Sequence, residues 1–227
     1  MNLAAQNIAT TLSDRVYETL CHAIVEGDLP PGSKISEPDL AKRLQVSRAS
    51  LREAIGRLEA CNLVTRKPNV GARVVELTSD QLLEIYHVRE ALEGMAARLA
   101  AQHMSEAEID ALKRLVEEHR QQVAQEADAN HSHFQHVGDL DFHLLIVQGS
   151  HNSRLINLFH NHLYQLLRMY RHRSGLNSQR TQPALTEHRY IVDVIAAGDA
   201  EMAELMMRRH VRASRENLER MLGSPPS

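Results

Sequence analysis

The sequence predicts a mainly α-helical protein, with a small α/β domain at the N-terminus and an all-helical, antiparallel bundle after it. Turn residues and two β-prone runs interrupt the helical stretches up to Leu77, whereas capped helical stretches follow one another from Thr78 onward. The charge balance changes at the same point, because acidic residues outnumber basic ones by 20 to 16 after Leu77. We therefore place the domain boundaries at 8–77 and 78–222.

The first predicted element is a supporting helix. Leu12, Val16, Leu20 and Ile24 recur every four residues, which is the spacing of a buried helix face, and Gly27 marks the end of the helix. We expect this helix to pack behind the two helices that follow it.

Two short helices separated by a tight turn are predicted between residues 36 and 64. Ser36 and Asp39 form an S-x-x-D capping signal for the first helix, with Pro38 in its first turn, where a missing N–H costs little. Ser47 is well placed to cap the second helix. The inward stripe of the second helix consists of Leu51, Ile55 and Leu58.

The front of the second helix is short, polar and cationic. Because the apolar stripe faces inward, the exposed side near the N-terminus carries Arg48, Ala49, Ser50 and Arg52. The major groove of DNA accepts a helix of this kind. We interpret the segment as a DNA-binding helix-turn-helix; the alternative is an ordinary helical hairpin inside a core.

Local charge and a predicted hairpin both favour DNA binding. Residues 42–73 contain eight basic and two acidic residues, in a chain whose formal net charge is −3. Within this segment two β-prone runs, 63–66 and 72–75, flank turn residues and predict a β-hairpin wing. The cationic and polar residues near its tip are Arg66, Lys67, Asn69 and Arg73. The N-terminal domain is thus predicted to be a winged helix-turn-helix.

The run from Ala23 to Val75 resembles the DNA-binding domain of GntR-type bacterial transcription regulators, through the motif S-R-x-x-L-R-E-A followed by R-L-E. The resemblance implies that Arg48 and Arg52 contact operator bases and that residues 47–50 contact phosphates or base edges. It also implies that Gly71, at the wing tip, enters the minor groove. Some members have an arginine where this chain has Pro38, so that contact should be absent here.

From Thr78 onward the sequence predicts six helices of an antiparallel bundle. Thr78 with Gln81, and Ser105 with Glu108, form capping boxes. The predicted helices span 79–102, 106–128, 132–149, 153–173, 184–197 and 200–222. The segment 174–183 is predicted to be a loop that could close over a ligand.

Thirteen of the 14 histidines lie beyond Leu77. His143 lies four residues after Asp139, so the two side chains share a helix face, and His188 and His210 belong to inward-facing apolar stripes. Neutral imidazole and carboxylate are suitable ligands for zinc, nickel, manganese or iron. A hydrogen-bonded core histidine is the more common case for each residue taken alone, so the residues by themselves leave both interpretations open.

Three segments of the second domain resemble the FCD effector domain of FadR-like GntR regulators: DLDFH at 139–143, EHRYI at 187–191 with the following AAGD, and MMRRH at 206–210. In metal-binding members the matching residues coordinate a divalent ion. The resemblance therefore implies a metal site formed by Asp139, His143, His188 and His210, with zinc expected and nickel, manganese or iron as alternatives. Six predicted helices rather than seven are typical of the VanR-like subgroup.

The effectors of this branch are commonly small organic acids, and the resemblance implies one here. A carboxylate can complete the coordination shell of the ion while an arginine pairs with its remaining charge. Arg89 matches a family arginine that faces the effector cavity. The alternative is a surface arginine that pairs with Glu93 one helical turn later.

We expect a cytoplasmic, homodimeric regulator, not an enzyme, that places two recognition helices on a pseudo-palindromic operator. An acid bound beside the ion would lower operator affinity, so the protein is expected to be a repressor. No apolar run approaches the roughly 20 residues that span a bilayer, so no membrane partner is expected. Two alternatives stay open: a purely structural ion, and a metalloenzyme, for which the sequence offers no H-E-x-x-H motif.

Overall fold

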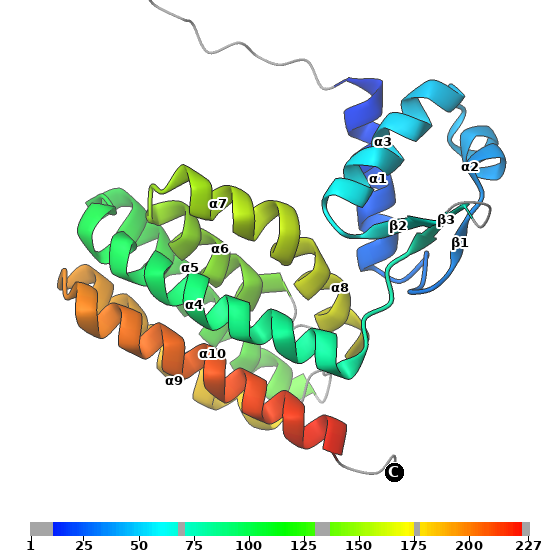
Figure 1. Cartoon of the computed structure of the whole chain (residues 1–227). Coiled ribbons are helices and arrows are strands. Elements are labelled where there is room, and N and C mark those ends of the chain that lie inside the picture. The colour runs from blue at the N-terminus through cyan, green and yellow to red at the C-terminus, as the bar shows by residue number, and fades with distance from the viewer. Residues whose placement is uncertain (1–10, 68–70, 130–136, 175–177, 224–227) are drawn as a thin grey trace, which may run out of the picture. The chain divides into compact units, whose positions relative to one another are not determined.

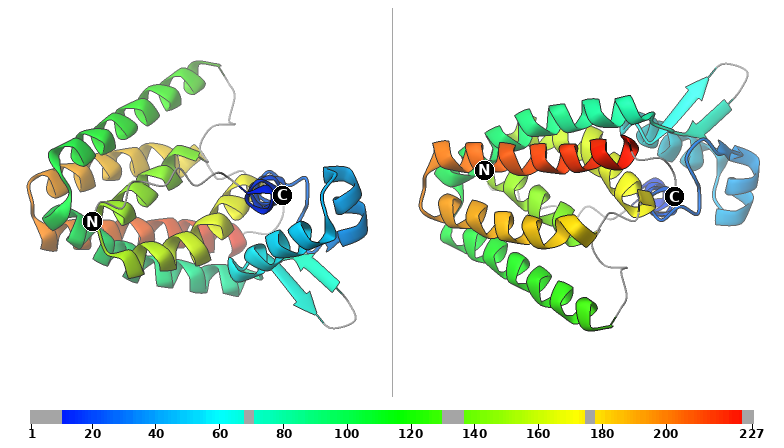
Figure 2. Two further views of the ribbon diagram at one scale, coloured as in Figure 1. Left: turned by 90° about the horizontal axis from the view of Figure 1, so that it is seen from above. Right: turned by 90° about the horizontal axis from the view of Figure 1, so that it is seen from below.

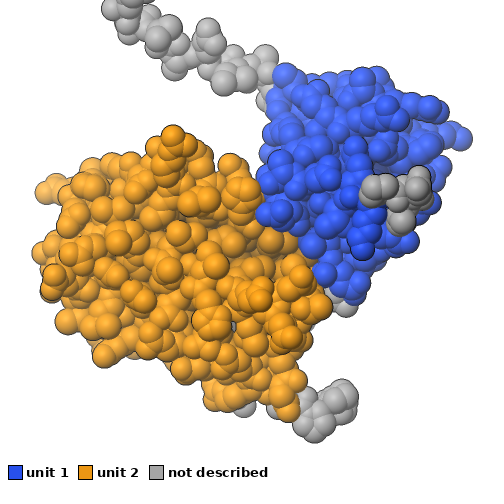
Figure 3. All heavy atoms as spheres, viewed as in Figure 1, with its two compact units in different colours: residues 1–76 blue, residues 77–227 orange. Residues whose placement is uncertain are grey.

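The computed structural model of the chain describes residues 11–67, 71–129, 137–174 and 178–223, with their side chains except in 126–140 and 171–179. The chain divides into two compact units, residues 1–76 and residues 77–227, which have different colours in Figure 3. Unit 1 combines helices with a small sheet, and unit 2 is helical throughout its described part, as the sequence predicts.

The described residues of unit 1 form three helices and a three-stranded antiparallel sheet (Figure 1). The elements are α1 (Leu12–Val25), β1 (Lys34–Ile35), α2 (Glu37–Leu44), α3 (Arg48–Ala60), β2 (Val64–Lys67) and β3 (Gly71–Val74). The strand order is β1-β3-β2, with Val64 opposite Val74 and Ile35 opposite Ala72. The predicted hairpin is confirmed with each strand displaced by one residue, and β1 is an addition that the sequence analysis did not predict.

The core of unit 1 forms between α1 and α3. Leu51, Ile55 and Leu58 of α3 are fully buried, and Leu20 and Ile24 of α1 are at most 2% exposed. The predicted inward stripe of α3 is therefore confirmed, and that of α1 is confirmed for Val16, Leu20 and Ile24, whereas Leu12 at the first position of α1 is 46% exposed. Burial of such side chains is the main favourable term in folding a unit of this size.

One predicted cap is confirmed and another is wrong. The Ser47 hydroxyl accepts a hydrogen bond from the backbone N–H of Ser50, so it caps α3 as expected. Ser36 stands at the N-cap of α2, but its side chain makes no capping hydrogen bond. A capping oxygen accepts a hydrogen bond from the N–H of the second or third residue of the helix. Pro38 is the second residue of α2 and has no N–H, so one of these two donors is missing.

Unit 2 is a bundle of long helices in which α4 and α10 lie side by side (Figures 1 and 2). Its elements are α4 (Ser79–His103), α5 (Glu106–Ala129), α6 (Val137–Gly149), α7 (Ser153–Phe159), the π-helical η1 (His160–Tyr164), α8 (Gln165–Ser174), α9 (Ser178–Ala196) and α10 (Ala200–Gly223). The capping boxes at Thr78 and Ser105 are both confirmed. The predicted helix 132–149 is described only from Val137, because 132–136 lie outside the described residues.

The expected loop at 174–183 is wrong over most of its length. Helix α9 already begins at Ser178 and includes Pro183. Pro183 removes only one backbone hydrogen bond near the start of the helix, so the helix continues through it. The Arg180 side chain bonds Glu187 two turns further along, and this contact ties the early turns to the rest of the helix.

The predicted single helix 153–173 also differs in detail, because the π-helical segment η1 separates α7 from α8.

The bundle encloses one apolar core, whose fully buried centre includes Phe142, Ile146, Ile191 and Met207. None of the helices in the described ranges combines the length and the hydropathy that a membrane crossing requires.

The Ser105–Glu108 cap predicts a specific pH dependence of stability. A hydrogen bond from His151, followed by the backbone and hydroxyl of Ser105, lowers the pKa of Glu108 from 4.5 to about 2. Because this pKa is lower in the folded state, the stabilisation is complete above pH 4.5 and is lost as the pH falls toward about 2. We expect Glu108→Gln to reduce the free energy of unfolding above pH 4.5 and to flatten its dependence on pH below that value, as measured by urea unfolding.

Glu106→Gln is the matched control for this experiment, because it changes a carboxylate in the same helical turn and leaves the cap intact. An equal flattening in both variants would show that general helix-end charge, rather than the cap, sets the pH dependence.

Candidate DNA-binding surface and metal centre

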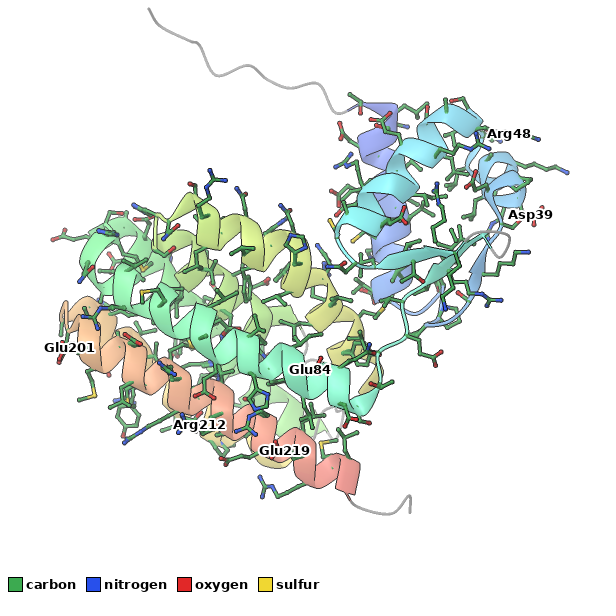
Figure 4. The ribbon with its side chains drawn as sticks, in the orientation of Figure 1. Asp39, Arg48, Glu84, Glu201, Arg212 and Glu219 are labelled. Carbon is green, nitrogen blue, oxygen red and sulfur yellow. The ribbon has the colours of Figure 1, made fainter. Side chains whose placement is uncertain are left out.

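The N-terminal end of α3 presents the predicted recognition residues to solvent. Ser47, Arg48, Ala49 and Arg52 are exposed, and Ser50 is half-buried because it takes part in the cap. Arg48 extends outward from the start of the helix (Figure 4). Among the described residues, the Arg48 side chain makes no hydrogen bond or ion pair. Its guanidinium is therefore exposed and available to a ligand.

Arg52 is engaged by an acidic neighbour on α2. Its Nε atom lies 2.9 Å from Oε2 of Glu37, and a nitrogen of Arg66 lies 3.9 Å from the other oxygen of the same carboxylate. The Arg52 side chain is 68% exposed, and pairs of this kind contribute little to stability in water. A DNA phosphate or base edge can therefore compete with Glu37 for both arginines.

The wing adds further cations to unit 1. The side chains of Arg66, Lys67 and Arg73 are exposed, and Arg73 also donates a hydrogen bond of 2.7 Å to the carbonyl of Gly32. Gly71 has a φ angle of 89° with open space where a Cβ atom would lie. This left-handed conformation favours glycine and permits close approach of backbone to a ligand. Asn69 lies outside the described residues.

Three of the four predicted metal ligands meet in the interior of unit 2. His143 of α6, His188 of α9 and His210 of α10 are 1–3% exposed. The Nε2 atom of His210 lies 3.2 Å from Nε2 of His188 and 3.2 Å from Nε2 of His143. The side chain of Asp139, the fourth predicted ligand, lies outside the described residues.

The outer ring nitrogens show how these histidines are oriented. Nδ1 of His143 lies 2.5 Å from a carboxylate oxygen of Glu93, and Nδ1 of His210 lies 2.7 Å from one of Glu187. A carboxylate only accepts hydrogen bonds, so in the neutral rings the proton lies on Nδ1 and the Nε2 lone pairs point at each other. Two lone pairs at 3.2 Å repel unless a cation lies between them.

The spacing of the cluster also fits a metal ion. Zinc–imidazole bonds are about 2.1 Å long, which places ligand nitrogens roughly 3.0 to 3.4 Å apart in octahedral or tetrahedral geometry. The two observed separations of 3.2 Å fall in this interval. Residues from three helices thus form a donor set that suits a borderline divalent ion such as zinc.

Arg89 lies in the same buried network. It is 2% exposed, its Nε atom donates a 2.6 Å hydrogen bond to Glu93, and its guanidinium lies 4.8 Å from the centre of the Tyr86 ring. The pairing with Glu93 was one of the two expected alternatives, but it occurs in the interior and not on the surface. Burial by itself raises the pKa of Glu93, and the charges of Arg89 and His143 more than offset this effect and lower it to about 2.

Sequence reasoning missed the role of the carboxylates around the cluster. Glu93 was considered only as a surface partner, and Glu187 only as part of a matching segment. Burial raises the pKa of Glu187, but hydrogen bonds from His210 and Arg180 lower it to about 2. The only available signals were the position of Glu93 one helical turn after Arg89 and the position of Glu187 directly before His188. Asp141 takes no part, since it accepts a 3.0 Å hydrogen bond from the Tyr164 hydroxyl.

Two family models match the chain, one in each unit. Residues 12–74 match the family described as bacterial regulatory proteins, gntR family, and residues 84–213 match the FCD domain. These matches, together with the winged fold, define the chain as a DNA-binding transcription regulator. It belongs to the GntR family and carries an FCD domain, which confirms the resemblance and the prediction that it is not an enzyme.

Relatives with related names cover almost the whole chain. One is the "Probable D-xylose utilization operon transcriptional repressor" of Paenarthrobacter nicotinovorans, which is 30% identical over 90% of this chain and 87% of its own. The HTH-type transcriptional regulator YdhC of Bacillus subtilis is 31% identical over 91% and 90%. A solved GntR regulator from Rhodococcus sp. RHA1 shares the fold, with a TM-score of 0.72 at 24% identity over 94% of this chain and 99% of that one.

Proposed function

We propose that this regulator is a metal-containing repressor that releases its operator when a small organic acid binds beside the ion. The observation that carries the proposal is the convergence of His143, His188 and His210 inside the FCD unit of a chain whose other unit presents an exposed cationic helix. The name of the Paenarthrobacter relative, an operon repressor, supports the sign of regulation.

The DNA-binding role is assigned to unit 1. Arg48 and Arg52 are positioned to contact base edges in the major groove, and Ser47, Ala49 and Ser50 border the same end of α3. The wing residues Arg66, Lys67, Asn69, Gly71 and Arg73 are assigned to the phosphate backbone and the minor groove. Two copies of the chain would read a pseudo-palindromic operator.

The sensing role is assigned to unit 2. His143, His188 and His210, with Asp139 from the family pattern, would hold the divalent ion. When bound, the ion supplies positive charge and coordination positions for a carboxylate oxygen. Arg89 is the effector-binding arginine of the family pattern; here its charge is balanced by Glu93, which also contacts His143, so the bound ion is the group that would favour an anion over a neutral ligand at this site.

Binding of an acid changes operator affinity only if the acid prefers one conformation of the regulator. The three histidines come from three different helices, so a ligand that pulls on the ion acts on the packing of α6, α9 and α10 together. We propose that the acid stabilises an arrangement of the bundles that does not fit the operator, and that it thereby lowers the affinity for DNA.

The assigned DNA contacts predict the behaviour of two arginine variants. Arg48→Ala and Arg52→Ala should each lose about 1–3 kcal/mol of discrimination between a duplex selected by the wild-type protein from a random library and a scrambled duplex. Fluorescence anisotropy at several salt concentrations measures this loss. Lys67→Ala is the control, since loss of a phosphate contact should weaken binding to both duplexes alike and reduce the salt dependence. Unchanged discrimination in the arginine variants would contradict the assignment.

The metal centre predicts a linked loss of ion and of sensing. His188→Ala and His210→Ala should contain little metal by mass spectrometric analysis, and a panel of small organic acids should raise the melting temperature only of metal-loaded wild-type protein. His162→Ala, an exposed histidine, should retain full metal content. Full metal content in the two buried variants would contradict the site. Metal binding without any response to acids would instead support a purely structural ion.

A further inference from the structure

Two of the three clustered histidines are held by a carboxylate that is itself held by an arginine. One series of contacts joins Arg89, Glu93 and His143, and the other joins Arg180, Glu187 and His210. We call each series an Arg–Glu–His relay.

The first relay is wholly buried. Arg89 and Glu93 of α4 and His143 of α6 have side chains that are only 1–2% exposed. Arg89 Nε donates to Oε1 of Glu93 at 2.6 Å, and the other oxygen, Oε2, lies 2.5 Å from Nδ1 of His143. Both oxygens of the carboxylate are in use, so it cannot rotate without losing a contact.

The second relay extends from the interior to the surface. Two guanidinium nitrogens of Arg180 donate hydrogen bonds of 2.9 Å and 2.5 Å to the two carboxylate oxygens of Glu187. One of these oxygens, Oε2, also lies 2.7 Å from Nδ1 of His210. Arg180 also donates a 3.3 Å hydrogen bond to the backbone carbonyl of His210. The side chains of Arg180 and Glu187 are 16% and 31% exposed, so this relay can be altered without leaving a charge stranded in the core.

We propose that Glu93 and Glu187 are positioning residues for the metal centre and that their arginines hold them in place. The inference rests on the metal site of the proposed function. An ionised carboxylate on Nδ1 fixes the tautomer and orientation of a ligating ring and makes Nε2 a stronger donor to the ion. A guanidinium that binds the carboxylate with two nitrogens restricts its orientation further.

The half-exposed second relay provides the test. The full-length protein, stripped of metal, is titrated with Zn²⁺ in competition with a chromophoric chelator. Glu187→Gln should bind Zn²⁺ about 10- to 100-fold more weakly than wild type, and Arg180→Gln should also bind it more weakly. Asp193→Asn and Arg189→Gln, exposed positions on the same helix, are the matched controls and should keep the wild-type affinity.

A spectroscopic measurement distinguishes positioning from a structural effect. Replacement of zinc by Co²⁺ should give a visible spectrum that is altered in Glu187→Gln, while the melting temperature of the metal-free protein stays close to that of wild type. The double variant Arg180→Gln/Glu187→Gln should bind Zn²⁺ no more weakly than Glu187→Gln alone, because Arg180 acts through Glu187. Additive losses, or unchanged Zn²⁺ affinity and spectrum, would overturn the relay. A wild-type protein that binds no Zn²⁺ would instead overturn the metal site itself.

An apolar stripe on the outside of α4 carries a second inference independently. Its members are Ile85, Val88, Leu92, Met95 and Leu99, spaced alternately by three and four residues. This is the heptad spacing of helices that pair with another helix. Val88 is 47% exposed and Met95 is 42% exposed, so the stripe is only partly covered by its own bundle.

The edge of this stripe has complementary charges. Glu84, Ala91 and Arg98 follow one another at intervals of seven residues along the solvent side of the stripe. Figure 4 labels Glu84 on α4. Arg98 pairs with Glu204 of α10 at 3.1 Å and remains 35% exposed. If two copies of α4 pair antiparallel with the two-fold axis near residues 90 and 91, Glu84 of each copy lies close to Arg98 of the other, and the small Ala91 lies beside the crossing point.

We infer that the α4 stripe is the surface on which a second copy of the chain docks, antiparallel to the first. This inference rests on the homodimer of the proposed function and assigns its interface. In this arrangement Val88 packs against Leu92 of the second copy, and Ile85 against Met95. The two-fold symmetry uses each contact twice, as an isologous interface requires.

Charge reversal tests this surface directly. Glu84→Arg and Arg98→Glu should each weaken the dimer in analytical ultracentrifugation, and the double variant Glu84→Arg/Arg98→Glu should recover it. Val88→Glu should give monomers, whereas Tyr190→Glu, an exposed apolar residue on α9, should leave the dimer unchanged. A dimer that resists Val88→Glu and both reversals would overturn this interface. A wild-type monomer would overturn the homodimer as a whole.

Discussion

The interior of unit 2 is organised by the need to pair buried charges. Glu93 and Arg89 have almost no exposure to water, and an ion in such a place is stable only when its partners are fixed. Removing one member of a buried pair typically costs about 3–5 kcal/mol, because the other charge is left without a partner. Glu93 contacts Arg89 one turn away on its own helix and His143 on α6, so this pairing joins α4 to α6.

The same centre reaches two further helices. His188 of α9 stacks on Phe142, with ring centres 3.9 Å apart, and His210 of α10 lies within 3.2 Å of both other histidines. If the proposed ion is bound by histidines from three helices, its binding free energy is coupled to the packing of these helices, and this coupling would let a bound ligand alter the bundle.

Helical periodicity and capping chemistry predicted most of the fold. The stripe of α3, the Ser47 cap and the box at Thr78 follow from local sequence, and the structure confirms them. Strand β1 was missed because two residues carry no period, and it exists only through its pairing with β3. The helix predicted from residue 184 begins at Ser178 instead, and no local rule reveals the pairing of Arg180 with Glu187 that supports its early turns.

The candidate site divides in the same way. The inward positions of His188 and His210 follow from helix periodicity, and both are buried as expected. Their use as a metal site was suggested by family resemblance, since spacing alone does not distinguish a ligand from a core histidine. The roles of Glu93 and Glu187 depend on which nitrogen of a ring on another helix they meet. Such contacts arise only when the helices pack, so the sequence could not supply them.

Arginine–glutamate pairs occur in both units, and their surroundings give them opposite uses. Arg52 and Glu37 form a pair of 2.9 Å at the surface, where water and salt screen the attraction and the pair is easily exchanged. Arg89 and Glu93 form a pair of 2.6 Å in the core, where neither ion can leave without a large desolvation penalty. The first kind suits a cation that is proposed to transfer to DNA, and the second suits a fixed charge beside a proposed metal ligand. Burial, rather than residue type, therefore separates the surface that we assign to DNA from the centre that we propose binds an acid.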